Sequence, residues 1–186
     1  MKQYLIIAGI VGMTSCKSGE KEKQDLTVKN NSITTTAPPA TTPIGKIDIE
    51  SFGAIKIGQP HVKTIEALGE PDNKSAAVEW GADGLMHEDW TYKAKGLKLD
   101  MTSAKGSSDG IKYVSSITAN AKCNYKTRAG MGIGNSYTEV QEAYKRDIDA
   151  TATDKEQITV GSIYGGIIFT FKNDKVVTVF LGAAAE

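Results

Sequence analysis

The side chains that most often carry catalytic or metal-binding chemistry are sparse in this sequence. The only histidines are His61 and His87, which is too few for a His-rich metal site. Oxygen ligands of the kind that bind calcium gather around the run His87-Glu88-Asp89, together with Glu79, Asp83 and Asp100. Their spacing does not match the EF-hand pattern. We therefore expect a solvated acidic loop here, with no bound metal and no other cofactor.

Motifs of nucleophilic and nucleotide-dependent enzymes do not occur in the sequence. It contains no Gly-x-Ser-x-Gly elbow, phosphate-binding loop or HExxH motif. The alternating glycines Gly130, Gly132 and Gly134 partly match a dinucleotide-binding turn, but the final glycine of that motif is missing. We interpret them as a tight entry to a helix, and His61 as a residue in the first turn of another helix. The sequence predicts that the protein is not an enzyme.

The composition indicates a globular domain without a strong electrostatic field. Lysine plus arginine and aspartate plus glutamate number 22 each, so the net charge is zero and nucleic acid is not an expected partner. A hydrophobic content of 40% and 19 glycines fit a folded domain with many turns. The chain is long enough for one domain, or for two small repeats that share a core.

The amino terminus has the pattern of an exported protein. Lys2 precedes an apolar run from Tyr4 to Met13, which is about half of the roughly 20 residues that a membrane-spanning helix needs. The following Met13-Thr14-Ser15-Cys16 resembles the lipobox of bacterial lipoproteins, with Met13 in place of the usual leucine. This resemblance implies that residues 1–15 are a signal peptide and that Cys16 carries the lipid, palmitate included, that anchors the protein in a membrane.

The segment after Cys16 is expected to be a tether. Residues 16–44 are polar and rich in Thr and Pro, a composition that cannot bury enough apolar surface to offset backbone ordering. By resemblance to lipoprotein sorting, Lys17 favours the outer membrane, on either its periplasmic or its surface face. Cys123 is then the one thiol left without lipid. We favour a buried, small hydrophobic role for it over a disulfide to another chain.

Two stretches of the chain repeat the same order of elements. Pro60 and Gly69 mark the start and end of a short amphipathic helix, and Ser136 with Glu139 forms a capping box at the start of a second. Gly58 and Gly134 align at a spacing of 76 residues. Strands are expected after each helix: 90–92, 96–101 and 112–119 in the first half, and 166–172 and 175–181 in the second, with Ile163-Tyr164 just ahead and Asn173-Asp174 as a two-residue turn.

This pattern predicts an α+β fold of tandem helix-plus-antiparallel-meander repeats, over residues 45–124 and 125–186. The chain contains the motifs Ile-x-Ile-Gly at 55–58, Ala-Leu-Gly-x-Pro at 67–71, Trp-x-Tyr at 90–92 and Gly-Leu-x-Leu at 96–99. In these motifs it resembles the β-lactamase inhibitory protein and the small outer-membrane lipoprotein family SmpA/OmlA. Members of these families act as protein-binding inhibitors or as accessory subunits of outer-membrane assembly. The resemblance implies a similar class of role here.

Two features are candidates for contact with a partner protein. The stretch 80–92 contains Trp80, Trp90 and Tyr92, and tryptophan is enriched in interface hot spots, although we favour the core for Trp90. The last hairpin is apolar on both expected faces, one with Ile167, Phe169, Phe171, Val176 and Phe180, the other with Ile168, Val177, Val179 and Leu181. The second face is expected to contact either the first half of the molecule or a partner, with Val177 and Val179 at the contact.

The sequence therefore predicts a lipid-anchored, non-enzymatic protein of the cell envelope that binds another protein or envelope component. The alternative is a structural accessory subunit of an outer-membrane assembly complex, with little affinity of its own.

Overall fold

The described residues form an antiparallel sheet with two α-helices. The computed structural model describes residues 50–184, and the expected signal peptide, Cys16 and the expected tether lie outside them. The elements are α1 (His61–Leu68), β1 (Asn73–Lys74), β2 (Val78–Glu79), β3 (Leu85–Tyr92), β4 (Leu97–Ala104), β5 (Tyr113–Ala119), α2 (Tyr137–Tyr144), the 3₁₀ helix η2 (Ala150–Ala152), β6 (Gln157–Ser162), β7 (Gly165–Lys172) and β8 (Lys175–Gly182). The expected α+β class is confirmed.

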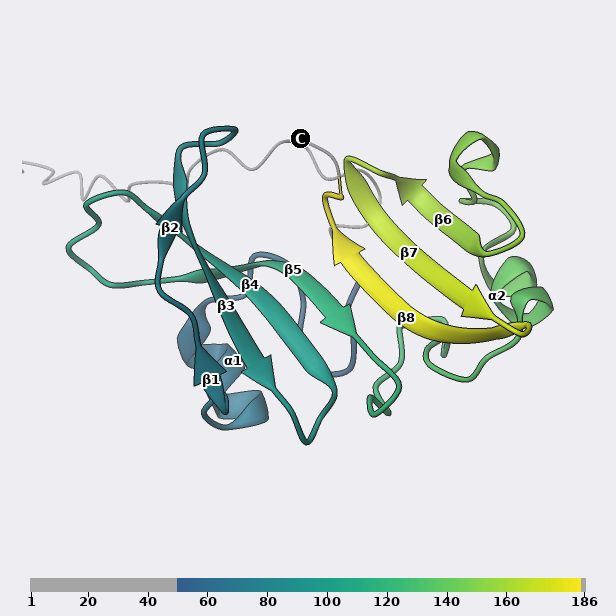
Figure 1. Ribbon diagram of the computed structural model, residues 1–186, viewed down its shortest axis with the longest axis horizontal. Helices are drawn as coiled ribbons and strands as arrows, with labels where there is room; N and C mark the ends of the chain where they lie inside the picture. Colours follow the sequence, from purple (N-terminus) through teal and green to yellow (C-terminus); the bar gives the residue numbers. More distant parts are fainter. Residues whose placement is uncertain (1–49, 185–186) are drawn as a thin grey trace, which may run out of the picture. The chain divides into compact units, whose positions relative to one another are not determined.

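The main part of the sheet consists of two three-stranded sets, β3-β4-β5 and β6-β7-β8, and each set runs in chain order from the outside of the sheet to its centre. Eight strands run in the order β1-β3-β4-β5-β8-β7-β6, with β2 also paired to β3 (Figure 1). The order β6-β7-β8 after α2 therefore matches the order β3-β4-β5, approached from the opposite edge. The last strands of the two sets, β5 and β8, pair at the centre of the sheet, where Thr118 lies opposite Phe180. Both hairpins at the centre contain a bulge, after Asp100 in β4 and after Thr170 in β7.

Both helices begin where the local sequence predicts, and α1 also ends at the predicted residue. α1 starts one residue after Pro60, which lies at the cap rather than the first helical position, and stops at Gly69, whose φ of 81° favours glycine. α2 is capped by Ser136. Its hydroxyl accepts a hydrogen bond from the Glu139 N–H, while the Glu139 carboxylate accepts one from the Ser136 N–H. Because such caps depend on neighbouring residues alone, the sequence is enough to place them.

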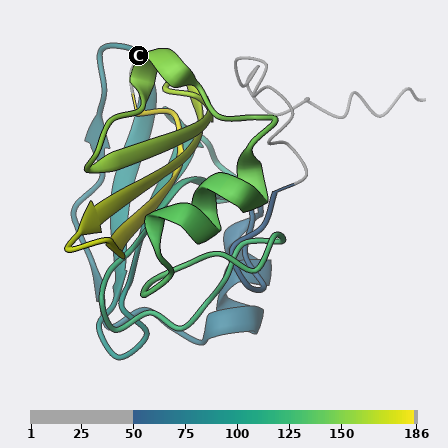
Figure 2. The same ribbon diagram turned by 90° about the vertical axis from the view of Figure 1, so that its right-hand side faces the viewer.

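The helices pack on one side of the sheet, where the core lies. Figure 2 shows α1 and α2 on the same side of the strands. Leu68 of α1 and Val140 and Tyr144 of α2 join the buried cluster, and the Tyr144 ring lies 5.7 Å from that of Phe169 in β7. Among residues 50–184, neither helix is long and apolar enough to cross a membrane.

The second half contains one strand that the sequence analysis missed. β6 precedes β7, and the expected Ile163-Tyr164 forms the turn between them, with Tyr164 62% exposed. Ile158 and Val160 are two positions apart in β6, which is the spacing of apolar residues on one face of a strand. Gly161 follows at once and interrupts this apolar pattern. The turn at Asn173-Asp174 is confirmed, with φ values of 50° and 60°.

The expected faces of the last hairpin were partly wrong. Val179 and Leu181 lie opposite Phe169 and Ile167 and share the core with them, each 1% exposed. The β7–β8 ladder pairs Thr170 with Thr178 but Phe171 with Val176, so Val177 is an extra residue. A bulge of this kind inverts the alternation of side chains. Val176, Val179 and Leu181 therefore face the core, while Phe180 faces the other side.

Candidate binding surface on the open sheet face

The side of the sheet without α-helices, here called the open face, brings together side chains from five strands. Its members alternate with core residues along each strand. They are His87, Asp89 and Thr91 of β3, Lys98, Asp100 and Thr102 of β4, Ser116 and Thr118 of β5, Thr178 and Phe180 of β8, and Ile168 and Thr170 of β7.

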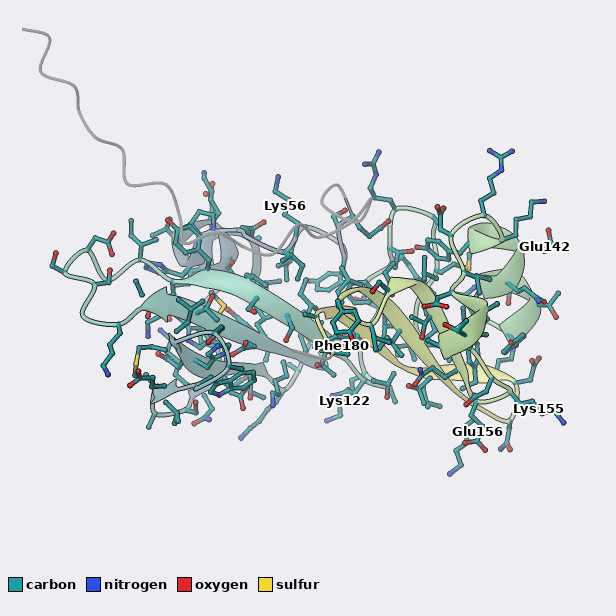
Figure 3. The ribbon with its side chains drawn as sticks, turned by 90° about the horizontal axis from the view of Figure 1, so that it is seen from above. Lys56, Lys122, Glu142, Lys155, Glu156 and Phe180 are labelled. Atoms are coloured by element: carbon teal, nitrogen blue, oxygen red, sulfur yellow. The ribbon has the colours of Figure 1, made fainter. Side chains whose placement is uncertain are left out.

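One row of the open face is continuous across these strands. Thr91 pairs with Lys98, Lys98 with Thr118, Thr118 with Phe180, and Phe180 with Ile168. Figure 3 labels Phe180 near the place where the two halves of the sheet meet. Phe180 and Ile168 are half-buried, and Thr118, Thr170 and Thr178 occupy neighbouring positions on the same face. The row is therefore polar from Thr91 to Thr118 and apolar at Phe180 and Ile168, with threonines next to the apolar pair.

One end of the open face carries a histidine between two carboxylates. The His87 Nδ1 lies 2.8 Å from the Asp100 Oδ2, and its Nε2 lies 2.9 Å from the Asp83 Oδ2. The His87 side chain is 3% exposed, against 13% for Asp100 and 28% for Asp83. The expectation of a solvated acidic loop is wrong here, because residues 85–92 form β3 and pair with β4, which brings Asp100 to His87.

Burial and the neighbouring charges shift the pKa values of all three groups in this cluster. Burial by itself lowers the pKa of His87, but the hydrogen bonds and charges of Asp83 and Asp100 outweigh it and raise that pKa above 6.5. Partial burial raises the pKa of Asp83, yet the Leu85 N–H and His87 bring it below its usual value. Burial raises the pKa of Asp100, and the His87 hydrogen bond offsets this only in part. Both carboxylates therefore favour the protonated form of His87.

Trp80 covers the histidine from the solvent side. The two rings are parallel within 5° and their centroids lie 3.7 Å apart, a geometry in which the indole face attracts an imidazolium. The turn that carries Trp80 is held by hydrogen bonds from the Trp80 N–H to the Leu85 carbonyl and from the Gly84 N–H to the Trp80 carbonyl. Trp80 nevertheless stays 44% exposed, which suits a contact residue.

The other predicted contact residues are not on this surface. Trp90 and Tyr92 are each 2% exposed and Val179 is 1% exposed, so their side chains cannot touch a partner. Val177, at the bulge, is half-buried. The core position of Trp90, which we favoured, is confirmed, whereas Tyr92 and Val179 as contact residues are wrong. Cys16 lies outside the described residues.

A second charged group lies beneath Trp90 on the core side. The Trp90 Nε1–H donates a hydrogen bond of 2.8 Å to Glu88, and Lys112 forms an ion pair with the same carboxylate. The Glu88 side chain is 8% exposed and that of Lys112 is 29% exposed, so the carboxylate is buried while the ammonium reaches solvent. Burial also raises the pKa of Tyr92 to about 12, with a further contribution from the charge of Glu70. We assign these groups to the structure of the core.

Cys123 is buried, as expected, at 5% exposure. Sequence reasoning missed the open-face roles of His87, Asp100, Ile168 and Phe180. The alternation of residues in β3 and β4 is the signal that could have found the first two, since it places His87 and Asp100 on the side opposite Trp90 and Leu99.

Metal chemistry finds no support in the described part of the chain. Within residues 50–184, no group of three or more His, Cys, Asp and Glu side chains is arranged to hold a metal ion. A shallow hollow is present on the side of α1, between the loop at 54–60 and the helix, and Lys56, Lys63 and Glu66 line it. The Lys63 ammonium is already paired with Glu66 at 2.7 Å. The open face is therefore the stronger candidate surface.

No family model, curated protein or solved structure matches the chain.

Proposed function

We propose that the protein is a lipid-anchored, non-enzymatic component of the bacterial cell envelope that binds another protein through the open face of its sheet. The main support is the continuous row through Lys98, Thr118, Phe180 and Ile168. It includes the apolar pair Phe180 and Ile168, and no α-helix of residues 50–184 lies over it.

The composition of the open face suits a protein interface. An interface core is typically apolar and aromatic, with a polar rim that makes hydrogen bonds. Phe180 and Ile168 supply the apolar centre, the neighbouring threonines supply the rim, and Trp80 adds an exposed aromatic side chain at one end. The charged side chains near the Trp80 end of the open face already form ion pairs with each other. Lys98 pairs with Asp89 at 3.0 Å, and Lys105 pairs with Glu79 at 2.7 Å. A partner that relies on strong charge attraction is therefore not favoured.

The location we propose rests on the amino-terminal sequence. Lipid on Cys16 would place the domain at the outer membrane, and the polar segment 16–44 would set its reach. Palmitate labelling of the intact chain and of a Cys16→Ala variant tests this. Loss of label and of membrane association in the variant is expected, and equal labelling would contradict the anchor.

We also propose that the fold is a tandem repeat of the β-lactamase inhibitory protein type, with the resemblance from sequence as its starting point. The mirrored strand order supports a relation between the halves, and so do the two bulges at matching places. In the first half, the Gly58 N–H donates to the Val114 carbonyl at 2.8 Å. In the second, the Gly134 N–H donates to the Val176 carbonyl at 2.9 Å. Sequence-distant segments thus contact β5 and β8 in the same way.

The binding surface can be tested by cross-linking in intact cells. The intact chain is compared with Phe180→Asp, which alters the centre of the open face, and with Val62→Asp on α1. Val62 is also exposed and apolar, at 58%, but it lies on the helix side. A specific partner that is recovered with the intact chain and Val62→Asp but lost with Phe180→Asp supports the proposal.

Equal recovery with both variants contradicts the use of the open face. If the partner is instead recovered only when the membrane complex is intact, and not with the detergent-solubilised protein, the result favours the accessory-subunit role. The thermal unfolding midpoint of each variant is compared with that of the intact chain, so that a loss of partner through misfolding can be recognised.

A further inference from the structure

The environment of His87 is unusual because both of its ring nitrogens face a carboxylate. A neutral imidazole has one N–H, so it can donate to only one of Asp83 and Asp100, and its bare nitrogen would face the oxygen lone pairs of the other. The two distances, 2.9 Å and 2.8 Å, are both those of charge-assisted hydrogen bonds. The geometry is therefore satisfied by the doubly protonated ring.

The two carboxylates come from different elements. Asp100 belongs to β4 and is fixed in the sheet opposite Asp89, whereas Asp83 belongs to the turn 80–84 between β2 and β3. The same turn carries Trp80, which stacks on the histidine. His87 is thus the link between a surface turn and the sheet beneath it.

We propose that His87 is a proton-dependent clamp: its imidazolium holds the turn 80–84, with Trp80, on the open face, and loss of the proton releases that turn. This inference extends the proposed function by adding regulation of the same surface. The clamp itself needs no partner, so it can be tested on the protein alone.

Apart from Asp83 and Asp100, the charged side chains on the strands next to His87 form ion pairs of their own, so the two aspartates are the charges that favour its protonation. On β2, Val78 lies opposite His87 and the neighbouring Glu79 is paired with Lys105. On β4, the residue opposite His87 is Thr102, which carries no charge. On β3, Asp89 is paired with Lys98. The Asp89 charge raises the pKa of Asp100, while the Ser115 hydroxyl lowers it.

The direction of the pH effect follows from the His87 pKa, which is raised above its ordinary value of 6.5. The stabilisation from the protonated ring is fully present below pH 6.5, since the histidine is then charged in both the folded and the unfolded chain. It is lost as the pH rises through the folded-state pKa. Release of the turn is therefore expected on the alkaline side of 6.5.

The experiment uses ¹⁹F NMR of the lipidated full chain, labelled with 5-fluorotryptophan and held in detergent micelles, from pH 5 to pH 9. Trp80 and Trp90 are the only tryptophans, so Trp80→Phe assigns the two signals. The histidine ring protons are followed in the same samples. Since His61 and His87 are the only histidines, His61→Gln assigns them and serves as the matched control.

The proposal predicts that the Trp80 signal shifts and narrows with the same midpoint as His87, above pH 6.5, and that His61→Gln leaves this transition unchanged. His87→Gln should remove the transition. Asp83→Asn, at a more exposed position, should lower both midpoints by about one pH unit because it removes one negative charge from the ring.

Three results would overturn the clamp. One is a Trp80 transition that persists in a folded His87→Gln chain. Another is a His87 midpoint at or below 6.5. The third, which does not depend on how well His87→Gln folds, is a Trp80 midpoint that stays in place when Asp83→Asn moves that of His87. Failure to recover a partner in the cross-linking experiment would leave all these signals unaffected, so the two proposals fail separately.

Discussion

Val179 and Phe180 are neighbours in β8, yet their side chains lie on opposite faces of the sheet. Val179 pairs with Phe169 and is 1% exposed, whereas Phe180 pairs with Thr118 and Ile168 on the open face. A charge at the first position enters the core, and a charge at the second meets solvent or a partner. These two residues therefore separate the stability of the domain from its binding.

The substitution Val179→Glu should unfold much of the protein, because it buries an unpaired carboxylate. We expect a loss of about 4 kcal/mol or more in the free energy of unfolding, measured by urea denaturation. Phe180→Glu should cost about 1 to 2 kcal/mol, since its side chain is half-buried and can move toward water. Similar losses for the two variants would contradict the assigned faces.

The parts of the fold that depend on adjacent residues were predictable from sequence. Gly69 ends α1, Ser136 and Glu139 cap α2, and Asn173-Asp174 turns the last hairpin. In each case the residues that make the interaction lie within a few positions of one another. A single sequence therefore contains the information needed.

The faces of β8 and the histidine cluster were not predictable in this way. The position of Val179 depends on a bulge that exists only when β7 and β8 are paired. The contact between His87 and Asp100 likewise depends on the register of β3 with β4. Spacing along the chain does not determine either register, so the acidic run looked like a loop and the core valine looked like a surface residue.

Alanine at Gly58 and at Gly134 should destabilise the protein to a similar degree. The two glycines have φ values of 76° and 86°, and a Cβ at either would meet no atom within 4 Å, so the cost is backbone strain alone. We expect about 1 to 2 kcal/mol for each variant. Gly81→Ala is the matched control, since it also has open space but lacks the positive φ.

Urea denaturation of the three glycine variants provides the measurement. Gly81→Ala should change the free energy of unfolding by about 0.5 kcal/mol or less. If Gly58→Ala and Gly134→Ala behaved like this control, the strained conformations would be absent. If one were costly and the other neutral, the proposed equivalence of the two halves would lose its support at this position.

The partly buried ion pair between Lys112 and Glu88 should contribute more to stability than an exposed ion pair. Lys112→Met leaves the Glu88 carboxylate, 8% exposed, with the Trp90 N–H as its remaining partner, and should cost about 3 kcal/mol. Lys98→Met removes an ion pair whose side chains are 52% and 45% exposed, and should cost about 1 kcal/mol or less. Equal losses in thermal or urea unfolding would show that Glu88 is solvated in the native protein.

The thiol of Cys123 should react slowly in the folded protein. Burial raises its pKa, and this outweighs the opposing effects of the Tyr125 N–H and the Lys126 charge, so little of the reactive thiolate forms near neutral pH. At 5% exposure, the sulfur is also shielded from reagents. In a Cys16→Ala chain, where Cys123 is the one thiol, labelling by iodoacetamide at pH 8 should be on the order of a hundredfold slower in buffer than in urea. Rapid, complete labelling in buffer, or a disulfide-linked dimer on a non-reducing gel, would instead show that this cysteine reaches the surface, where it can pair with another chain.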